Sequence, residues 1–441
     1  MSKNERNGAA AEASQARILP ADDIDEEVLD RDARRVVLRL QRHGFEAYFV
    51  GGCVRDLMIG RTPKDFDVAT SATPQDVRRL FRNGRIIGRR FRLVHVYYGN
   101  HIIETATFRR DPVKSEGEDG DDLLITEDNV FGTAAEDARR RDFTVNGLFL
   151  DPATHEIHDY VNGLEDLEDR VLRTIGEPEV RMAEDPVRIM RAIKFATRLD
   201  FRIDDDTWKA MCTHAPDLSR SAPPRVFEEI LRLLRSGSSL GAFRMLRACG
   251  GLDVLLPQIS AHLGQRKGAD DASIERAEHF WRLLEALDSE VHAGFEPSTS
   301  VAIAVLFLHV IEHQADPKLR TLPGEPGKIE DVCWEVIEPV AAPTRLSRRD
   351  FGGARRIIQQ QARFTEPQGT RFSPLLFALA EEFPEALDLF RLRALARGQG
   401  WDIYQGWHDR YERALDADED EINDERRRIR RGQRKRRRRR R

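Results

Sequence analysis

Two aspartates, Asp65 and Asp67, stand at alternate positions in the segment PKDFDVAT, residues 63–70. Side chains of a β-strand alternate between its faces at about 3.3 Å per residue, so the two carboxylates share one face with Cα atoms about 6.6 Å apart. Phe66, between them, faces the other way, into a core. Carboxylates at this spacing can share a divalent cation. They suit Mg²⁺, which uses one or two carboxylates together with substrate phosphates, and Mn²⁺ can replace it.

Two adjacent glycines, Gly51 and Gly52, precede this pair and separate a predicted strand over residues 46–50 from a predicted short helix. Glycine lets the backbone approach phosphates closely, and a helix N-terminus favours anions. Either feature alone is more often a turn or a solvated strand end. Together, each at the end of a strand, they indicate a site for a nucleotide and its metal ion.

The elements that position these residues are predicted from apolar spacing and turn signals. A helix over residues 31–43 ends at Gly44, and Thr73-Pro74 opens another helix through Phe81. Residues 92–99 and 101–108 read as a β-hairpin. From about residue 164 onward, amphipathic helices alternate with Gly/Pro breaks. The sequence therefore predicts an α+β head followed by an all-helical remainder.

Four motifs occur in order between Gly51 and Ala192: GG…VRD…PKDFD, then RRRDFTVN at 139–146, DYVNGLEDL at 159–167 and EDPVRIMRA at 184–192. They resemble the signature of the class II template-independent nucleotidyltransferases. This DNA polymerase β-like superfamily contains bacterial poly(A) polymerases and CCA-adding enzymes. A weaker similarity continues in PPRVFEEI, residues 223–230.

The resemblance implies a polymerase-β-like head with a mixed sheet, followed by helical neck, body and tail domains. We expect the catalytic head at 31–165, the neck with its base-reading helix at 166–240, and an RNA-binding body and tail at 241–425. A disordered leader, 1–30, and a disordered Arg-rich tail, 426–441, flank them.

The same resemblance assigns roles to individual residues. Asp65 and Asp67 are the expected metal ligands and catalytic carboxylates. Glu104, on the second strand of the hairpin, would complete a triad if that strand neighbours the strand carrying Asp65 and Asp67; otherwise it forms a surface ion pair. Asp142 is a further candidate catalytic carboxylate and shapes the nucleotide pocket near the sugar, with Asn146 on the same helix face. The remaining expected nucleotide-binding residues are Gly51, Gly52, Arg55, Asp185, Arg188 and Arg191.

Asp185 and Arg188 are spaced i, i+3 on one predicted helix, with Arg191 one turn further on. The carboxylate and the guanidinium groups form a set of acceptors and donors suited to the edge of a base. A helix-surface ion pair is the alternative.

Three further segments favour the poly(A) branch of the superfamily. Two segments resemble the corresponding segments of bacterial poly(A) polymerases: IIGRRFRLVHVYYG at 86–99 and DNVFGTAAEDARRRDF at 128–143. Residues 370–394, with the Arg-rich tail, resemble the C-terminal domain of these enzymes. The implied activity is the transfer of AMP from ATP to RNA 3′ ends without a template, which promotes RNA processing and decay. RNA-decay proteins are candidate partners. The alternatives are a CCA-adding enzyme and a non-catalytic RNA-binding protein of the same fold.

The charge is unevenly distributed along the chain. Residues 426–441 contain 13 Lys or Arg and no acid, so residues 1–425 carry a net charge of −18 against −5 for the whole chain. Such a tail attracts a polyanion through counterion release, and RNA is the expected partner. A solubilising or targeting tail is the alternative. The acidic segment 115–129 reads as a mobile solvated loop.

The remaining features exclude other classes of protein. No stretch approaches the roughly 20 apolar residues of a membrane span, and the N-terminus lacks a secretory signal. Four dispersed cysteines predict neither disulfides nor a zinc site, so we expect a cytoplasmic protein. His309-Val-Ile-Glu312-His313 matches a zinc-peptidase pattern but has no companion motif. The aromatic stripe from Trp401 to Tyr411 reads as core packing rather than a surface for base stacking.

Overall fold

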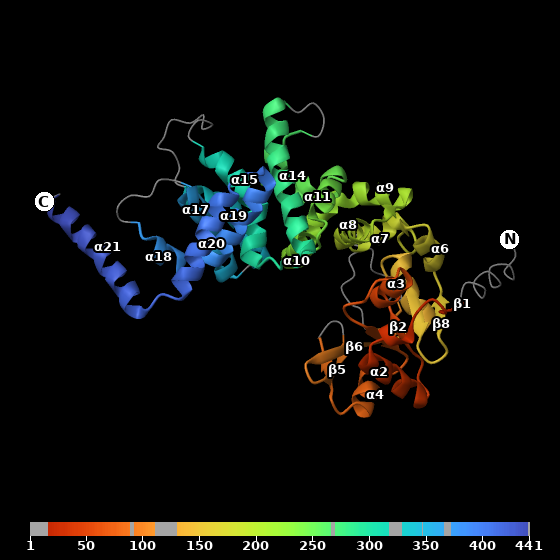
Figure 1. Cartoon of the computed structure of the whole chain (residues 1–441). Helices are drawn as coiled ribbons and strands as arrows, with labels where there is room; N and C mark the ends of the chain where they lie inside the picture. Colours follow the sequence, from red (N-terminus) through yellow and green to blue (C-terminus); the bar gives the residue numbers. More distant parts are fainter. Residues whose placement is uncertain are drawn as a thin grey trace. The chain divides into compact units, whose positions relative to one another are not determined.

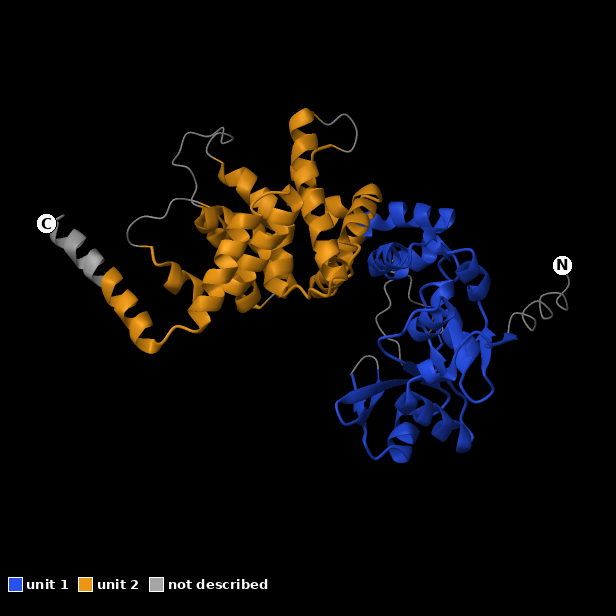
Figure 2. Ribbon diagram, in the orientation of Figure 1, with its two compact units in different colours: residues 1–217 blue, residues 218–441 orange. Residues whose placement is uncertain are grey.

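The computed structural model describes residues 16–88, 92–110, 130–265, 270–316, 329–345, 347–365 and 372–439. The chain divides into two compact units, residues 1–217 and 218–441 (Figure 2). The first unit joins the α+β head to helices up to His214. The boundaries predicted at residues 165 and 240 stay predictions.

The first unit is built on a mixed eight-stranded sheet with the order β1-β8-β7-β2-β3-β6-β5-β4 (Figure 1). Its centre pairs β2 antiparallel to β3 and β3 parallel to β6, and β6 forms the predicted hairpin with β5. The mixed sheet confirms the predicted class of head. The strands are β1 (Arg17–Pro20), β2 (Ala47–Val50), β3 (Asp67–Thr70), β4 (Gly84–Ile87), β5 (Leu93–Tyr98), β6 (His101–Thr107), β7 (Leu148–Asp151) and β8 (Glu156–Asp159).

Helices of the head form where the sequence places apolar stripes and caps. Helix α2 (Arg31–Arg42) buries Ala33, Val36, Val37 and Leu40, as its spacing predicts, and contacts β2 and β3. Thr73 caps α4 (Pro74–Leu80) in a capping box with Asp76. Near β2 and β3, α5 (Ala134–Arg139) packs Ala134 and Ala138 into a cluster with Val50, Ala69, Phe108 and Phe149. The other helical segments are η1 (Glu26–Val28), α3 (Gly52–Met58), η2 (Thr144–Asn146) and α6 (Gly163–Glu168).

The first unit continues through three helices: α7 (Pro178–Glu184), α8 (Val187–Leu199) and α9 (Asp205–His214). A two-stranded parallel ribbon, β9 (Val171–Leu172) with β10 (Arg202–Ile203), contacts α8. These two strands are too short to give a period-two signal, which is why the sequence indicated almost no strand beyond residue 164.

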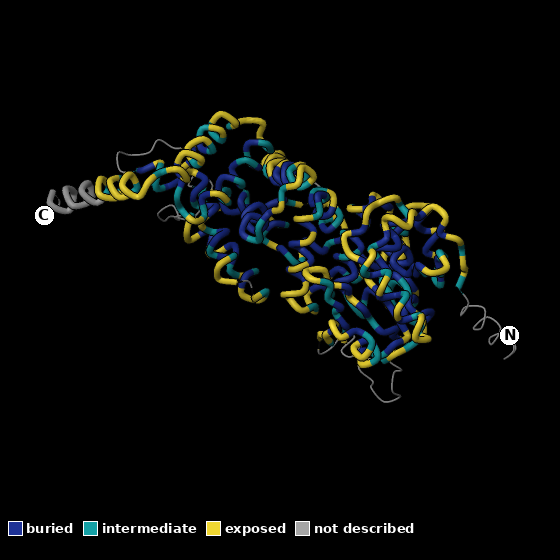
Figure 3. Tube along the Cα trace, turned by 60° about the horizontal axis from the view of Figure 1, so that its bottom comes forward, coloured by how far each residue is buried: buried dark blue, intermediate teal, exposed yellow. Residues whose placement is uncertain are grey.

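The second unit is all-helical in the described residues, as predicted. Helix α15 (Thr299–Ala315) is buried along most of its length, contacts α16, α17 and α19, and holds the apolar run at residues 301–308. Buried positions run through the interior of both units (Figure 3). No described helix is both long enough and apolar enough to cross a membrane. The other helices are η3 (Ala215–Arg220), which begins in the first unit, α10 (Pro223–Leu234), α11 (Ser239–Ala248), α12 (Gly251–Leu255), α13 (Pro257–Leu263), α14 (Asp271–His292), α16 (Ile329–Thr344), α17 (Arg348–Thr365), α18 (Pro374–Ala378), α19 (Phe383–Arg397), α20 (Trp401–Leu415) and α21 (Glu419–Arg439).

Both predicted disordered ends contain regular structure. In the leader, residues 17–20 form β1 at the edge of the sheet. They pair with the edge of β8 that β7 does not occupy, and Ala21, Ile24 and Leu29 bury their side chains. In the tail, α21 extends to Arg439, and its first turns carry ion pairs at i, i+3 such as Arg427–Asp424. The first 15 residues and the acidic loop at 115–129 lie outside the described residues.

Two sequence motifs that were not assigned to the active site, the His309–His313 segment and the aromatic stripe from Trp401 to Tyr411, can be placed in the structure. Burial, with Arg393 nearby, lowers the pKa of His309 to about 3, and the imidazole lies 3.7 Å from Glu312. No group of three or more His, Cys, Asp or Glu in the described residues is arranged to hold a metal ion. Trp407 is buried and donates to the carbonyl of Phe364 at 3.1 Å, which confirms core packing for this ring, whereas Trp401 is exposed.

Gly163 allows the closest approach of backbone segments in the head. A Cβ at this position would lie 2.2 Å from the carbonyl oxygen of Thr144, in the η2 turn. We expect Gly163→Ala to destabilise the head by roughly 1–3 kcal/mol, because the added carbon displaces backbone that cannot rotate away. Chemical denaturation followed by far-UV circular dichroism measures this loss.

Gly406→Ala is the matched control, since its Cβ would have ordinary contacts inside α20. It is expected to be neutral or slightly stabilising. Equal losses for the two variants would contradict the packing argument.

Candidate active site

Asp65 and Asp67 lie at the start of β3, on the side opposite to a buried phenylalanine. Phe66 is 8% exposed and packs edge-on against Phe49 at 5.2 Å, while both aspartates are exposed. The strand begins at Asp67 rather than at Asp65 as predicted, because its neighbour β2 ends at Val50, which pairs with Asp67. The aspartates still lie on one side of the chain, available for the chemistry expected of them.

Glu104 lies on the strand next to Asp67, which fulfils the condition set by the sequence. Val68 pairs with Thr105 in the parallel ladder, so Asp67 and Glu104, each one residue earlier, are side by side. The Glu104 carboxylate also lies 3.5 Å from the imidazole of His95 on β5. The tertiary structure therefore brings Glu104 beside Asp67, although the two residues are far apart in the sequence.

Negative charge is crowded at this point. Burial of the carboxyl group, together with the neighbouring carboxylates of Glu104 and Asp65 and against the opposing effect of Arg141, raises the pKa of Asp67 to about 6. A site that holds several carboxylates with one nearby cation favours a further positive charge.

The donor set fits a hard divalent cation shared with a phosphorylated ligand. Asp65 and Asp67 offer accessible carboxylate oxygens on one side of the chain, the ligands that Mg²⁺ uses together with phosphates. The described residues do not form a closed three-carboxylate cluster. The metal-binding roles of Asp65, Asp67 and Glu104 stay predictions.

The glycine turn lies directly before α3. Gly51 has a left-handed φ of 75° and caps the helix that Gly52 begins. A Cβ on Gly51 would lie 2.9 Å from Nη1 of Arg141, so glycine keeps this guanidinium close to the turn. The arrangement places bare backbone and a cation beside each other, as expected for a phosphate site.

Arg55 and Asn146 connect α3 to the η2 turn. Arg55 has a 3% exposed side chain, donates to Asp56, and donates to Oδ1 of Asn146 at 2.6 Å. Asn146 in turn donates to Asp142 at 3.1 Å. Its turn is a 3-10 helix that begins after Asp142, not the α-helix that was predicted. In this structure Arg55 lies beneath the site and orients Asn146.

Asp142 is the junction between the RRRDFTVN segment and α8. Its Oδ2 accepts from Nε and Nη2 of Arg191 at 2.7 and 2.5 Å. Burial acts to raise the pKa of Asp142, but the charge of Arg191 and the donors around it outweigh that effect and lower the pKa. Asp142 is therefore a buried anion held between two elements.

The expected base-reading residues do not all lie on one helix. Helix α7 ends at Glu184 with Asp185 as its C-cap, and α8 begins only at Val187, because Pro186 lacks an N–H and interrupts the helical ladder. Arg188 is buried and donates to the backbone carbonyl of Arg181 at 2.6 Å. Asp185 and Arg188 remain close enough for the carboxylate to raise the pKa of the arginine, although burial lowers it overall.

Arg181 is a residue whose role sequence reasoning missed. Its Nη2 donates to the carbonyls of Arg140 and Arg141 at 2.7 and 2.8 Å, and its Nη1 to Glu184. It joins α7 to the segment that carries Asp142. A second such residue is Phe195, whose ring contacts the guanidinium groups of Arg55 and Arg191. The contacts of Arg181 with the two carbonyls and of Phe195 with Arg55 have no local sequence signal, since they join segments distant in the chain.

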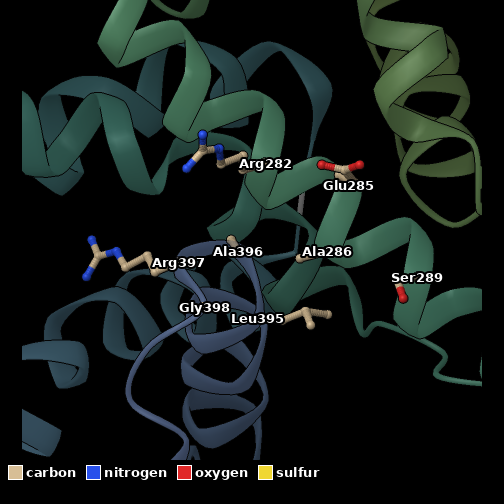
Figure 4. Close-up of a pocket in the computed structure, with 8 residues that line it drawn as sticks. All are labelled: Arg282, Glu285, Ala286, Ser289, Leu395, Ala396, Arg397 and Gly398. Carbon is tan, nitrogen blue, oxygen red and sulfur yellow. The ribbon is translucent and has the colours of Figure 1, made fainter.

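A depression in the second unit differs from the site in the head in its charged residues. It has a volume of about 430 Å³ between α14 and α19, with Arg282 and Arg397 towards one end and Glu285 apart from them (Figure 4). Glu285 is the sole carboxylate among its lining residues, so it has no acidic pair. The candidate active site is therefore the one in the head.

The fold is that of a template-independent nucleotidyltransferase. The structure aligns with the crystal structure of the Bacillus stearothermophilus CCA-adding enzyme in complex with CTP, with a TM-score of 0.64 and 25% identity over 87% of this chain and 82% of that one. Family models match at residues 47–173 (Poly A polymerase head domain), 200–263 (probable RNA and SrmB-binding site of polymerase A) and 328–441 (polymerase A arginine-rich C-terminus).

Comparison with sequence relatives distinguishes between the two branches of this enzyme class. Poly(A) polymerase I of Salmonella typhi is 37% identical over 385 residues, which cover 84% of this chain and 80% of the relative. The CCA-adding enzyme of Lactobacillus delbrueckii is 35% identical over 58% of this chain and 63% of the relative. The chain belongs to the bacterial poly(A) polymerase family and is a nucleotidyltransferase.

The crowding around Asp67 can be measured directly. In metal-free protein, the carboxyl of Asp67 should titrate near pH 6, and Glu104→Gln should lower its pKa because a neighbouring negative charge is removed. Carbon-detected NMR titration of the aspartate side chains gives both values. Glu156→Gln, at the distant strand β8, is the control and should leave Asp67 unchanged. An unchanged pKa in Glu104→Gln would show that the two carboxylates do not interact.

Proposed function

We propose that this protein is a polynucleotide adenylyltransferase that adds AMP from ATP to RNA 3′ ends without a template. The observation that carries the proposal is the alignment of Asp67 with Glu104 across β3 and β6, beside Asp65 and the glycine turn, in a head that matches the poly(A) polymerase model. The CTP complex of the related CCA-adding enzyme supports a nucleoside triphosphate as the substrate class.

In the proposed reaction, the RNA 3′-oxygen attacks the α-phosphorus of ATP and pyrophosphate leaves. Asp65 and Asp67, with Glu104 as the third carboxylate, would hold Mg²⁺ or Mn²⁺, which supplies charge neutralisation and lowers the pKa of the attacking hydroxyl. The glycine turn at Gly51 and Gly52 takes the phosphates, with Arg141 beside it. Catalysis of this kind depends on positioning and electrostatic stabilisation, so it needs no covalent enzyme intermediate.

The sugar and base would lie between the η2 turn and α8. Asp142 and Asn146 present their polar groups near the sugar, and their orientation depends on Arg191 and Arg55. Asp185 and Arg188 are the proposed contacts to the base edge. Because Arg188 is anchored on the carbonyl of Arg181, its remaining donors have a fixed direction.

RNA is the proposed second substrate. The family model over residues 200–263 is described as a probable RNA-binding site, and it covers α9 to α13. RNA-decay proteins as partners and a cytoplasmic location stay predictions.

The second candidate, a CCA-adding enzyme, is favoured by the solved structure with the related fold. The sequence relative of that kind covers 58% of this chain, whereas the poly(A) polymerase of Salmonella typhi covers 84% and the C-terminal arginine-rich model matches as well. A non-catalytic RNA-binding protein would gain nothing from the repulsion among three carboxylates. Adenylate transfer is therefore the better-supported function.

Incubation of pure protein with Mg²⁺, an RNA oligonucleotide and each nucleoside triphosphate separately tests the proposal. We expect a growing homopolymer with ATP and little product with CTP, GTP or UTP, resolved on denaturing gels. Asp67→Asn should reduce the rate at least about 100-fold, since charge stabilisation of this kind contributes several kcal/mol to catalysis. Ordered addition of C, C and A to tRNA would select the second candidate, and near-wild-type activity of Asp67→Asn would refute the metal-binding role.

The arginine-rich end of α21 gives a second test. Residues 426–441 carry 13 positive charges beside a body of net charge −18, so their deletion should weaken RNA binding and flatten its salt dependence, because fewer counterions are released. ATP binding in the head should remain nearly unchanged. Fluorescence anisotropy over a salt series measures both.

A full-length variant with the same arginines replaced by glutamine is the matched control for chain length. Unchanged or tighter RNA binding with the same salt slope would instead indicate that the tail folds back on the acidic body.

A further inference from the structure

Beyond β3, which carries Asp67, the sheet continues with β6, β5 and β4. Residues paired across neighbouring strands share a face. Glu104 pairs with His95, and His95 pairs with Arg85. Since Asp67 lies beside Glu104, the four residues form one row across four strands. Neighbouring strands are about 4.8 Å apart, so the row spans about 14 Å from Asp67 to Arg85.

This face is open, while the opposite face is packed. On β5, Val94 and Val96 are fully buried, as is Ile103 on β6. Their neighbours His95 and Tyr97 are partly exposed, and Arg85 is exposed. Ile102, the strand partner of Tyr97, is 43% exposed, which is unusual for a large apolar side chain in a sheet. The open face thus presents a tyrosine, an imidazole and an isoleucine that no core of described residues covers.

The exposed rings and the arginine are in contact with one another. The guanidinium of Arg85 lies 5.6 Å from the ring centre of Tyr97, and the rings of His95 and Tyr97 are 6.2 Å apart. Flat groups next to a cation, on an open sheet, suit unstacked bases and the phosphates between them. A folded protein partner is less suited, since the apolar part of this face is small.

We propose that this face, defined by Arg85, His95, Tyr97 and Ile102, binds the 3′-terminal nucleotides of single-stranded RNA and guides them to the carboxylates. The inference rests on the proposed function, because it takes the 3′-oxygen to react beside Asp67. Bases stack on Tyr97 and His95 and pack against Ile102, and Arg85 contacts the backbone phosphate. The row of residues ends at Asp67, beside which the 3′-oxygen reacts, so binding of RNA on this face also orients its 3′ end.

Tyr97→Ala and Arg85→Ala test the face. A stacked base contributes about 1–3 kcal/mol, so Tyr97→Ala should weaken RNA binding about 5- to 150-fold. Binding is measured by anisotropy with a labelled oligoadenylate in the Asp67→Asn background, which separates this test from failure of the proposed activity. Tyr97→Phe keeps the ring and should restore the affinity. The KM for ATP in the active protein should not change.

Tyr98→Ala is the matched control, since the adjacent tyrosine points to the other face of β5 and lies near Arg35 and Arg39 of α2. Its effect on RNA affinity should be less than about twofold. Thermal unfolding of each variant checks that the head is intact, and Arg85→Ala, at an exposed site, provides the result if Tyr97→Ala does not fold. Unchanged RNA affinity in both face variants, or a loss of ATP affinity instead, would overturn the proposal.

Discussion

The parallel pairing of β3 with β6 is the constraint on which the site depends. It places Asp67 beside Glu104, although burial and the neighbouring charge of Glu104 both disfavour the charged form of Asp67 and raise its pKa. The repulsion is tolerated because the backbone ladder and the buried partners Val68 and Ile103 fix both strands from the opposite face. Core packing therefore offsets the repulsion between the two carboxylates, which a bound cation would reduce.

A second set of contacts ties the nucleotide pocket together. Asp142 accepts from Arg191 on α8 and from Asn146 on η2, and Asn146 accepts from Arg55 on α3. Arg181 adds a connection from α7 to the carbonyls beside Asp142. Each of these buried charged groups has a partner, which is the condition for burying charge at low cost. Four elements thereby act as one support under the site.

Much of the head could be predicted from local patterns. The spacing of apolar residues gave α2, the Thr73-Pro74 cap gave α4, and Gly99-Asn100 gave the β5–β6 hairpin. The predictions of disorder at the two ends were wrong where structural contacts override the preference that local composition suggests. The leader forms β1 because β8 provides a pairing edge, and in the tail α21 carries acidic residues in its first turns that pair with arginines three residues further on. Pro186 was the available signal that Asp185 and Arg188 do not share one helix.

The sequence by itself determined the chemistry, because residue types and short-range spacing suffice to place Asp65 and Asp67 on one side of the chain and glycines before a helix. It also determined the family, through motifs in a fixed order. Only the tertiary structure decided which distant groups meet: Glu104 with Asp67, Arg191 with Asp142, and Arg85 with Tyr97. Strand register and side-chain packing set these contacts, and both depend on the whole fold rather than on neighbours in the chain.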